Sequence, residues 1–333
     1  MIISRTPYRI SFFGGGTDYP VHYKKHGGAV LATSINKYCY ISLRYLPPFF
    51  NYKHRIVYSK VELIKKISEI DHPAVRETLK FANIKKGVEI HHDGDLPARA
   101  GLGTSSSFTV GLLNALYALQ GKIATKRQLA KEAIHIEQNM IKENVGSQDQ
   151  ITASFGGFNK IEFNGDDDFR VQPITIGLDR YNLLQDHMML FFTGFSRTAS
   201  QIAGEQIKKT PERKKELTRM REMVDEAIDV LNDKSTDLTD FGKLLHENWM
   251  IKRKLTSKIT TSTIDQIYNR AQKAGAIGGK LLGAGGGGFV LFFVEPKKHE
   301  KVKEKLKDLL YVPFKFENLG SQIIYYTRSD EEL

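Results

Sequence analysis

The sequence predicts an α+β protein of two domains, and three observations support this prediction. Segments with the periodicity of strands and of amphipathic helices mix in both halves of the 333-residue chain, without the strict alternation of an α/β sheet. Residues 165–185 are polar and rich in turn formers, as expected of a boundary. The length allows one large or two ordinary domains, each with its own core. We therefore expect one domain at 1–175 and a second at 176–333.

In the first half, alternating and helical patterns assign most of the chain to regular elements. Strands are expected at 2–13, 28–46 and 85–93, and helices at 60–81, 108–119 and 125–142. Thr125 and Gln128 have the spacing of a capping box at the start of the last helix. Gly14–Pro20 is a turn that neither a helix nor a strand favours. Residues 143–150 are a polar loop or the entry to a short helix.

The second half continues with the same mixture of elements. Strands are expected at 187–193, 289–294 and 323–327, and helices at 211–232, 238–255, 263–274 and 297–310. In the first of these helices Leu217, Met220, Val224, Ala227 and Leu231 share one face. Gly275 is expected to end the helix at 263–274.

Composition limits the classes of partner. The net charge of +11 fits nucleic acid, an anionic membrane surface or phosphorylated small molecules. Much of the charge lies in runs such as Glu212–Arg221, where acids alternate with bases as on a solvated helix face. No basic block interleaves with aromatics, and no apolar run approaches the ~20 residues of a membrane helix. We expect neither nucleic acid nor a membrane as partner.

The compartment follows from cysteine use and from the N-terminus. The one cysteine, Cys39, lies in an apolar, strand-like run, where it is expected to pack in the core. The first ten residues are strand-like and lack the apolar region and cleavage site of a signal peptide. These features predict a cytoplasmic protein.

The segment Leu96–Ser107 leads from a strand, through a glycine loop and a hydroxyl cluster, into a buried helix. Glycines allow a backbone to approach a ligand closely, and the first N–H groups of a helix are unpaired and carry the positive end of its dipole. Such a helix start binds anions, most often phosphate. The hydroxyls at 104–107 could also ligate a magnesium ion shared with that phosphate. A plain loop with serine caps is the structural alternative.

A second glycine loop, Lys280–Gly288, contains a formal GxGxxG pattern. A dinucleotide fingerprint requires a helix after this pattern, whereas a strand-like run follows here. The chain also lacks the GxxxxGK[ST] motif of P-loop proteins. Four consecutive glycines cost conformational entropy on folding. Close approach to a ligand is therefore expected at this loop, and a tight hairpin is the alternative.

Three segments occur in an order that resembles the GHMP kinases, the superfamily of galactokinase, homoserine kinase and mevalonate kinase. They are TPYRISFFGGGTDY near the start, PARAGLGTSSS in the middle and KLLGAGGGGF near the end. The resemblance spans nearly the whole chain. It implies a mixed α/β ATP-binding domain followed by a ferredoxin-like α+β domain. It also implies an ATP-dependent phosphotransferase with an alcohol acceptor, using ATP and Mg²⁺.

The resemblance assigns roles to single residues. Arg9 falls on the basic residue of the first family motif, near the reacting hydroxyl, and Asp149 resembles the catalytic base of the galactokinase pattern CGxMDQ. Ser105 and Glu137 resemble the magnesium ligands of the family. The nucleotide is expected at Arg99, Gly101, Leu102, Gly103, Thr104, Ser105, Ser106 and Ser107. The sugar is expected at Gly15, Gly16, Asp18, Tyr19, Arg197, Lys280, Gly285 and Gly286.

Each main assignment has a structural alternative. Arg9 could be a surface strand residue, Asp18 a turn residue, and Asp149 a helix N-cap. Glu137 and the run Lys252–Lys254 could lie on solvated helix faces. A second interpretation of the Lys252–Lys254 run is that it binds a sugar phosphate together with Arg99, Arg197 or Lys280.

Two departures from the galactokinase pattern concern the substrate. Gly15 and Gly16 stand where galactokinases carry Glu-His, which indicates a larger or differently placed sugar. Arg99 replaces a glycine beside the phosphate loop, where its guanidinium could bind a second phosphate. The GGGTDY form of the first motif is similar to bacterial D-glycero-D-manno-heptose 7-phosphate kinases, which phosphorylate the anomeric O1 on the route to GDP-heptose. The alternatives are fucokinase-like or galactokinase-like sugar 1-kinases and a non-catalytic sugar-phosphate binder.

Overall fold

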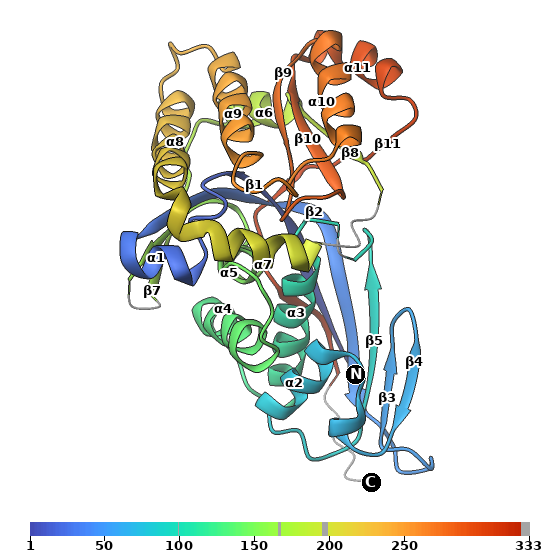
Figure 1. Ribbon diagram of the computed structural model, residues 1–333. Coiled ribbons are helices and arrows are strands. Elements are labelled where there is room, and N and C mark those ends of the chain that lie inside the picture. The colour runs from blue at the N-terminus through green and yellow to red at the C-terminus, as the bar shows by residue number, and fades with distance from the viewer. Residues whose placement is uncertain (99, 166–167, 195–198, 328–333) are drawn as a thin grey trace.

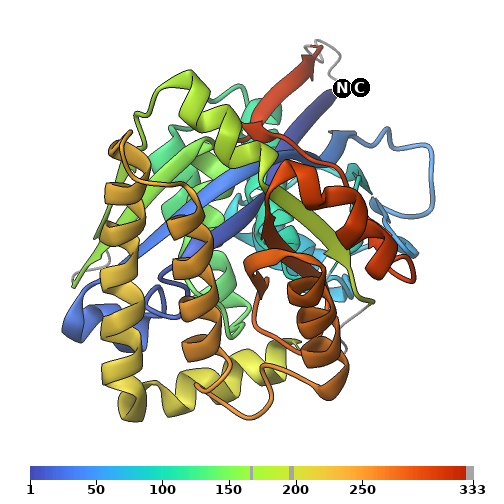
Figure 2. The same ribbon diagram turned by 90° about the horizontal axis from the view of Figure 1, so that it is seen from above.

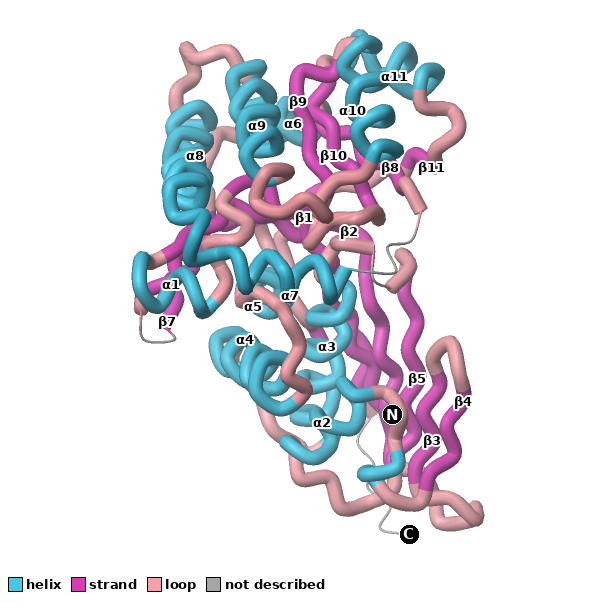
Figure 3. The backbone as a smooth tube through the Cα atoms, in the orientation of Figure 1, coloured by secondary structure: helices cyan, strands magenta, loops and turns pink. Residues whose placement is uncertain are grey.

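Two β-sheets and the helices packed on them make up the fold (Figures 1 and 3). The structure is a computed structural model that describes residues 1–98, 100–165, 168–194 and 199–327. A nine-stranded sheet contains the first and the last strand of the described chain, and a four-stranded sheet is formed by strands from the second half. Helices and strands mix in both parts, so the predicted α+β class is confirmed.

Two long strands organise the larger sheet. β1 (Ile2–Phe13) pairs antiparallel with β2 (Gly28–Tyr45), and the predicted turn and the short helix α1 (Pro20–His26) connect them. The other edge of β2 pairs first with β6 (Phe158–Asn164) and later with β5 (Val88–Gly94). The remaining strands are β3 (His54–Val57), β4 (Val61–Ile64), β7 (Asp168–Pro173), β12 (Phe316–Glu317) and β13 (Gln322–Tyr326). The main strand order is β13-β1-β2-β5-β3-β4.

A group of four helices packs beside this sheet (Figure 1). They are α2 (Pro73–Phe81), α3 (Thr104–Leu119), α4 (Lys126–His135) and α5 (Gln148–Phe155). α3 packs directly on β1 and β2 and is surrounded by the other three helices, which explains why its sequence is apolar on most sides. Thr125 caps α4 by accepting from the N–H of Gln128, as predicted. α4 then continues into a π-helical turn, Ile136–Met140, which is a feature often found at functional sites.

The smaller sheet has the order β11-β8-β10-β9. Its strands are β8 (Met188–Phe192), β9 (Ala276–Leu281), β10 (Phe289–Val294) and β11 (Leu310–Tyr311). The helices of this half are α6 (Leu178–Asp186), α7 (Ala199–Lys209), α8 (Lys214–Asn232), α9 (Thr239–Lys252), α10 (Ser262–Ala274) and α11 (His299–Lys305). Figure 2 shows α8 and α9 side by side. The predicted apolar face of α8 is buried, and Gly275 ends α10 as expected.

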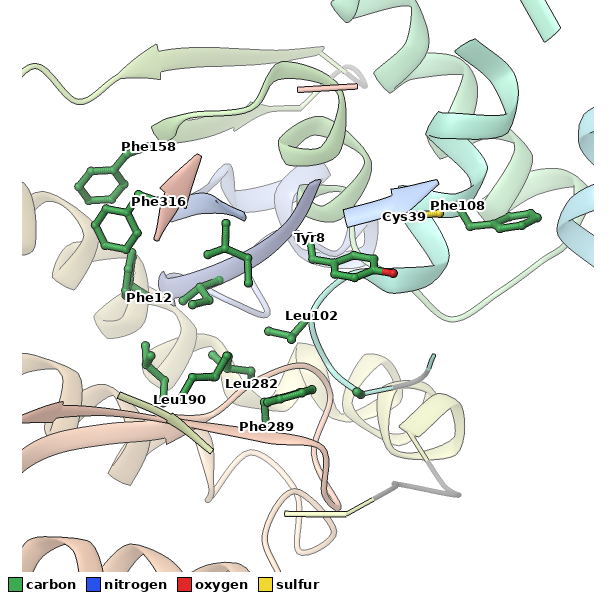
Figure 4. Packing of buried hydrophobic residues seen from close by; sticks show 14 of the residues in the cluster. Tyr8, Phe12, Cys39, Leu102, Phe108, Phe158, Leu190, Leu282, Phe289 and Phe316 are labelled. Carbon is green, nitrogen blue, oxygen red and sulfur yellow. The ribbon is translucent and has the colours of Figure 1, made fainter. Parts of the chain in front are cut away.

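One hydrophobic core continues from the larger sheet to the smaller one (Figure 4). Phe12 of β1 makes edge-to-face contacts with Phe158 and Phe316 of the same sheet. Leu190 of β8 and Phe289 of β10 belong to the same cluster. Because side chains of both sheets share this core, loops from the two sheets are held close together. No helix in the described part of the chain is long and apolar enough to cross a membrane.

The helix predicted at 60–81 is wrong over its first half. Val61–Ile64 form β4, which pairs with β3, and α2 begins only at Pro73, a residue that fits the first turn of a helix. Glu62 is buried, and its carboxylate accepts from two backbone N–H groups just before α2. These local bonds to Glu62 favour a strand and turn over a continuous helix. The helix predicted at 297–310 is also shorter, since α11 ends at Lys305.

The last two strands return to the larger sheet. β12 pairs with β2, and β13 pairs with β1. The chain therefore leaves the larger sheet after β7 and enters it again at Phe316. A domain boundary at 175/176 stays a prediction.

Candidate active site

A cavity of about 420 Å³ opens where loops from the two sheets meet. Its wall consists of the turn after β1, the start of α3, the loop before α5 and the loop after β9, with side chains from α7 and α9. Twelve of the predicted site residues line it: Arg9, Gly15, Gly16, Asp18, Tyr19, Gly101, Gly103, Thr104, Ser105, Ser106, Asp149 and Lys280. The three glycine-rich segments, far apart in the sequence, therefore contribute to one space.

The central loop presents the start of α3 to this cavity. Gly103 is the N-cap residue, with a φ of 72° that glycine adopts without strain. Thr104 and Ser105 line the cavity in the first turn, and the N-cap residue, Gly103, has no side chain that could cap the helix. The positive end of the α3 dipole thus borders the cavity, which suits an anion. Leu102 and Ser107 have structural roles, because Leu102 lies in the core and Ser107 Oγ donates to a β1 carbonyl at 2.8 Å.

Arg9 and Asp149 form a bidentate ion pair beside the start of α3. Arg9 Nε donates to Asp149 Oδ1 and Nη2 donates to Oδ2, each at 2.7 Å, while Nη1 donates to Gly101 O at 2.8 Å. The Arg9 side chain is 5% exposed and that of Asp149 is 24% exposed. Arg9 is therefore not a surface residue. Asp149 is not an N-cap either, because Ser147 occupies that position in α5. The two parallel hydrogen bonds from the Arg9 guanidinium fix the orientation of the Asp149 carboxylate at the cavity.

Asp18 joins the turn after β1 to the loop before α5. Its Oδ1 accepts from the N–H of Gly16 at 2.8 Å, and its backbone carbonyl accepts from the N–H of Ser147 at 3.0 Å. A Cβ on Gly146 would lie 1.9 Å from Asp18 Oδ2, so the loop packs tightly on this carboxyl. Burial raises the pKa of Asp18, and the nearby charge of Asp149 adds to the rise. Asp18 is thus both a turn residue and a buried carboxyl lining the cavity.

Glu137 is fully buried on the π-helical turn, so it does not lie on a solvated face. Ser106 Oγ donates to Glu137 Oε2 at 2.8 Å, and the side-chain amide of Gln150 donates to the same oxygen. Successive residues of a helix are rotated by about 100°, and this rotation places Ser106 toward Glu137 while Ser105 is exposed. Burial raises the pKa of Glu137 to about 7, and neighbouring hydroxyl groups, Ser106 among them, counteract part of the rise.

The surroundings of Glu137 fit a magnesium ion. Glu137 Oε1 is buried and has no hydrogen-bond partner among the described residues. Carboxylate and hydroxyl oxygens are ligands that Mg²⁺ prefers. In the described ranges, no group of three or more His, Cys, Asp or Glu could hold a metal. A magnesium ion here would therefore need oxygens from a bound nucleotide as well, which is common for this ion.

Two lysines reach the cavity from the smaller sheet and from α9. Lys280 was predicted as a site residue, and its Nζ donates to Phe12 O at 2.7 Å. Lys252, the last residue of α9, donates from Nζ to Gly283 O at 2.6 Å and is only 5% exposed. The interpretation of Lys252 as a solvated residue is therefore wrong, because its side chain turns inward to the loop after β9.

Some predicted residues lie elsewhere. Glu137, which is buried behind Ser106, and the two glycines Gly285 and Gly286 are not among the residues that line this cavity. Gly286 N–H donates to Ile259 O at 3.0 Å, and a Cβ on Gly285 would lie 2.7 Å from Ile259 Cα, so both glycines allow close packing of two loops. Arg99 and Arg197 lie outside the described residues.

Several polar residues of the cavity were not predicted from the sequence, among them Ser11 and Gln148. Ser11 Oγ and Gln148 Oε1 are buried and have no hydrogen-bond partner in the described chain, although both residues line the cavity. Both could have been found, since Ser11 is two residues from Arg9 on one strand and so shares its face. Gln148 directly precedes Asp149.

Comparisons with known proteins show which family the chain belongs to. The family model described as GHMP kinases N terminal domain matches residues 62–157, and the model described as GHMP kinases C terminal matches residues 226–312. The D-glycero-alpha-D-manno-heptose 7-phosphate kinase of Campylobacter jejuni is 30% identical over 331 residues, covering 93% of this chain and 95% of that protein. The galactokinase of Thermotoga maritima is 24% identical, covering 91% of this chain and 92% of that protein.

A solved structure has a fold similar to that of this chain over nearly the whole length of both proteins. It is the crystal structure of a D-glycero-D-manno-heptose 1-phosphate kinase from Bacteroides thetaiotaomicron, with a TM-score of 0.74 and 25% identity, covering 98% of this chain and 100% of that one. Because family models match both halves and a relative is similar over the full length, the chain belongs to the GHMP kinase family and is an ATP-dependent sugar kinase.

Proposed function

We propose that this kinase transfers the γ-phosphoryl group of ATP to the anomeric O1 hydroxyl of D-glycero-D-manno-heptose 7-phosphate. The product would be the 1,7-bisphosphate, a precursor for GDP-heptose and surface polysaccharide synthesis. The name of the Campylobacter jejuni relative supports this choice of substrate. One feature of the cavity wall supports it independently.

That feature is the open space at Gly15. Gly14 and Gly16 have positive φ values, and a Cβ on either would collide with a neighbour. Gly15 has no positive φ, and a Cβ there would meet its nearest neighbours at 3.8 and 3.9 Å. Its backbone therefore does not require glycine. The missing side chain leaves room where galactokinases, by the resemblance, carry a larger residue, and a seven-carbon sugar could use that room.

Unpaired polar atoms border this space. The nearest neighbours of the open position at Gly15 are Ser11 Oγ and Gln148 Nε2. Ser11 Oγ and Gln148 Oε1 are buried without partners in the described chain, and such a buried polar atom costs about 1–3 kcal/mol. Sugar hydroxyls both donate and accept, so they would satisfy these atoms on binding. The carboxyl of Asp18 would accept a hydrogen bond from another hydroxyl of the sugar.

The chemistry of phosphoryl transfer requires positioning and neutralisation of charge, with little covalent help from the protein. Asp149 would orient the acceptor hydroxyl and take its proton as the phosphoryl group leaves ADP. An anomeric hydroxyl is more acidic than an ordinary alcohol, which suits a carboxylate base. Arg9 would hold this carboxylate in place through its two hydrogen bonds and stabilise negative charge on the reacting oxygens.

The nucleotide phosphates would bind at the start of α3, on the backbone N–H groups of residues 103–106 and on the hydroxyls of Thr104 and Ser105. When bound, Mg²⁺ would neutralise charge on the β- and γ-phosphates, with Glu137 and Ser106 as its protein ligands. Ser105, expected from the resemblance to be a ligand, would instead face the nucleotide from the exposed side of the helix. The phosphate of the sugar would bind to cations, of which Lys280 lines the cavity.

A substrate screen tests this proposal. ADP release would be measured with free and phosphorylated hexoses and heptoses, each with ATP and Mg²⁺. We expect the highest kcat/KM with D-glycero-D-manno-heptose 7-phosphate and a much lower value with the free heptose. Equal use of phosphorylated and free sugars, or a preference for galactose, would reject the assignment of the substrate.

A further inference from the structure

Lys252 and Lys280 are buried and have no acidic partner among the residues that the structure describes. They are 5% and 1% exposed, and no carboxylate of the described chain forms an ion pair with either ammonium group. Lysine is rarely buried this completely unless it is paired, because removing an unpaired charge from water is costly. A ligand that brings negative charge into the cavity would remove this cost.

Backbone carbonyls accept only some of the hydrogen bonds that the two ammonium groups can donate. Lys252 Nζ donates to Gly283 O at 2.6 Å and, with a longer contact, to Leu281 O at 3.4 Å. Lys280 Nζ donates to Phe12 O at 2.7 Å. Each ammonium carries three N–H donors, so both keep donors beyond these contacts. Both residues line the cavity, and the remaining donors are available to a ligand there.

The contacts of Lys252 place it next to the phosphate-binding loop. Its main acceptor is the carbonyl of Gly283, and a Cβ on Gly283 would lie 2.5 Å from Gly101 Cα. From another direction, Arg9 Nη1 donates to Gly101 O at 2.8 Å. The residues that follow Gly101 and precede Gly283, Leu102 and Leu282, lie in the same core cluster (Figure 4). Lys252 and Arg9 thus approach the same loop residue, and Arg9 holds the proposed base.

We propose that Lys252 contacts the γ-phosphoryl group of ATP and neutralises its charge during transfer. This inference deepens the proposed function. It rests on that function for the position of the nucleotide phosphates, and it does not depend on which sugar is the acceptor. Lys252 comes from the second half of the chain, whereas the loop, Arg9 and Asp149 come from the first, so the complete phosphate site requires both halves.

The electrostatics around Lys252 favour a phosphate ligand. Burial and the like charge of Arg9 lower the pKa of Lys252 to about 8, and Asp18 and Asp149 counteract part of this shift. Lys280 adds a further buried amine, with a pKa lowered by burial, by Lys252 and by Arg9. A phosphate group between Lys252 and Arg9 would replace this repulsion with two attractions.

Nucleotide binding without a sugar tests the proposal. Affinities for Mg²⁺-AMPPNP and for Mg²⁺-ADP would be measured by titration calorimetry for the wild type, Lys252→Met and Lys254→Met. Lys254 is exposed in the same Lys-Arg-Lys run, so its variant is a matched control. For Lys252→Met we expect the AMPPNP affinity to fall at least about tenfold, as for one lost charge-assisted hydrogen bond. The ADP affinity should change less than about twofold, and Lys254→Met should change neither.

Equal losses of ADP and AMPPNP affinity, or no loss of either, would overturn the proposal. A thermal melt separates a structural role from a functional one. Relief of the buried charge offsets the hydrogen bonds that Lys252 loses to Gly283 O and Leu281 O, so Tm should change little. A lower Tm with equal losses of both nucleotides would make Lys252 structural. Steady-state kinetics complete the test, because a rise confined to the KM of the sugar would assign Lys252 to the acceptor. A wrong assignment of the sugar leaves the nucleotide result unaffected.

Discussion

Asp149→Asn removes the charge of the proposed base and keeps its shape. In the wild type, the carboxylate accepts two charge-assisted hydrogen bonds from Arg9, both 2.7 Å long. The amide of the variant keeps one acceptor but turns an NH₂ group toward the second guanidinium N–H. One such bond contributes about 1.5–3 kcal/mol. The 24% exposure of the Asp149 side chain lets water solvate the freed group, so we expect the lower end of this range. A protein of ordinary stability, about 5–15 kcal/mol, stays folded.

The loss of activity should be much larger than the loss of stability. Removing a general base lowers kcat by about 10²–10⁴, which corresponds to about 2.7–5.4 kcal/mol of transition-state stabilisation. We would measure kcat by a coupled ADP assay, stability by thermal melting and AMPPNP affinity by calorimetry. AMPPNP affinity should stay within about twofold of the wild-type value, because a base acts on the acceptor.

Asp229→Asn, an exposed change on α8, is the control and should alter none of these quantities. Near-normal kcat in folded Asp149→Asn would refute the role of Asp149 as base. An equal loss of kcat and AMPPNP affinity would make Asp149 a residue that only positions the loop and Arg9.

Three further predictions concern the metal, the sugar and pH. Glu137→Gln and Ser106→Ala should each raise the Mg²⁺ concentration needed for half-maximal rate, since the first removes the negative charge of the ligand and the second removes a hydroxyl oxygen. Ser105→Ala should leave the half-maximal Mg²⁺ concentration unchanged. If Ser105→Ala raised this concentration more than Ser106→Ala does, the pairing of Ser106 with Glu137 at the metal would be contradicted. Gly15→Glu should raise the KM for heptose 7-phosphate at least about tenfold and leave the KM for ATP unchanged, because the side chain fills space now bordered by atoms 3.8 Å away. An unchanged sugar KM would mean that the substrate does not use this space. The pKa of Lys252 is about 8, and its protonated form is the one that holds phosphate, so AMPPNP affinity should be full below this pH and fall as pH rises through it. The other titratable residues of the described chain that line the same cavity are Arg9, Lys280, Asp18, Asp149, Glu143 and Tyr19. Lys252→Met should lack this pH step, and the same step in the variant would assign it to another group.

Elements with a strong local pattern could be predicted from the sequence. The apolar face of α8, the buried run of α3 and the glycine end of α10 are all local features, and the structure confirms them. β4 could not be predicted, because it depends on pairing with β3 and on hydrogen bonds that Glu62 makes to residues nine and ten positions later. The two-residue strand β12 carries no periodicity, and its return to β2 is a long-range contact.

The candidate site could likewise be predicted from the sequence only where the signal is local. The loop sequence predicts an anion site at the start of α3, and the motif order places Arg9 and Asp149 near it, where the structure pairs them. The orientation of neighbouring side chains could not be predicted, because rotation of α3 decides that Ser106 meets Glu137. Lys252 lies in a run that is typical of a solvated face, and only the packing of α9 against β9 turns it inward.

The proposed reaction is phosphorylation of the anomeric oxygen of a heptose 7-phosphate. The most direct measurement is ³¹P NMR of the purified protein with ATP, Mg²⁺ and D-glycero-D-manno-heptose 7-phosphate. We predict that ADP and a sugar bisphosphate appear in equal amounts, and that the new phosphorus signal couples to the anomeric proton H1. No ADP with this substrate while a free hexose is consumed, or a new phosphate that couples to a proton other than H1, would rule out the proposed reaction.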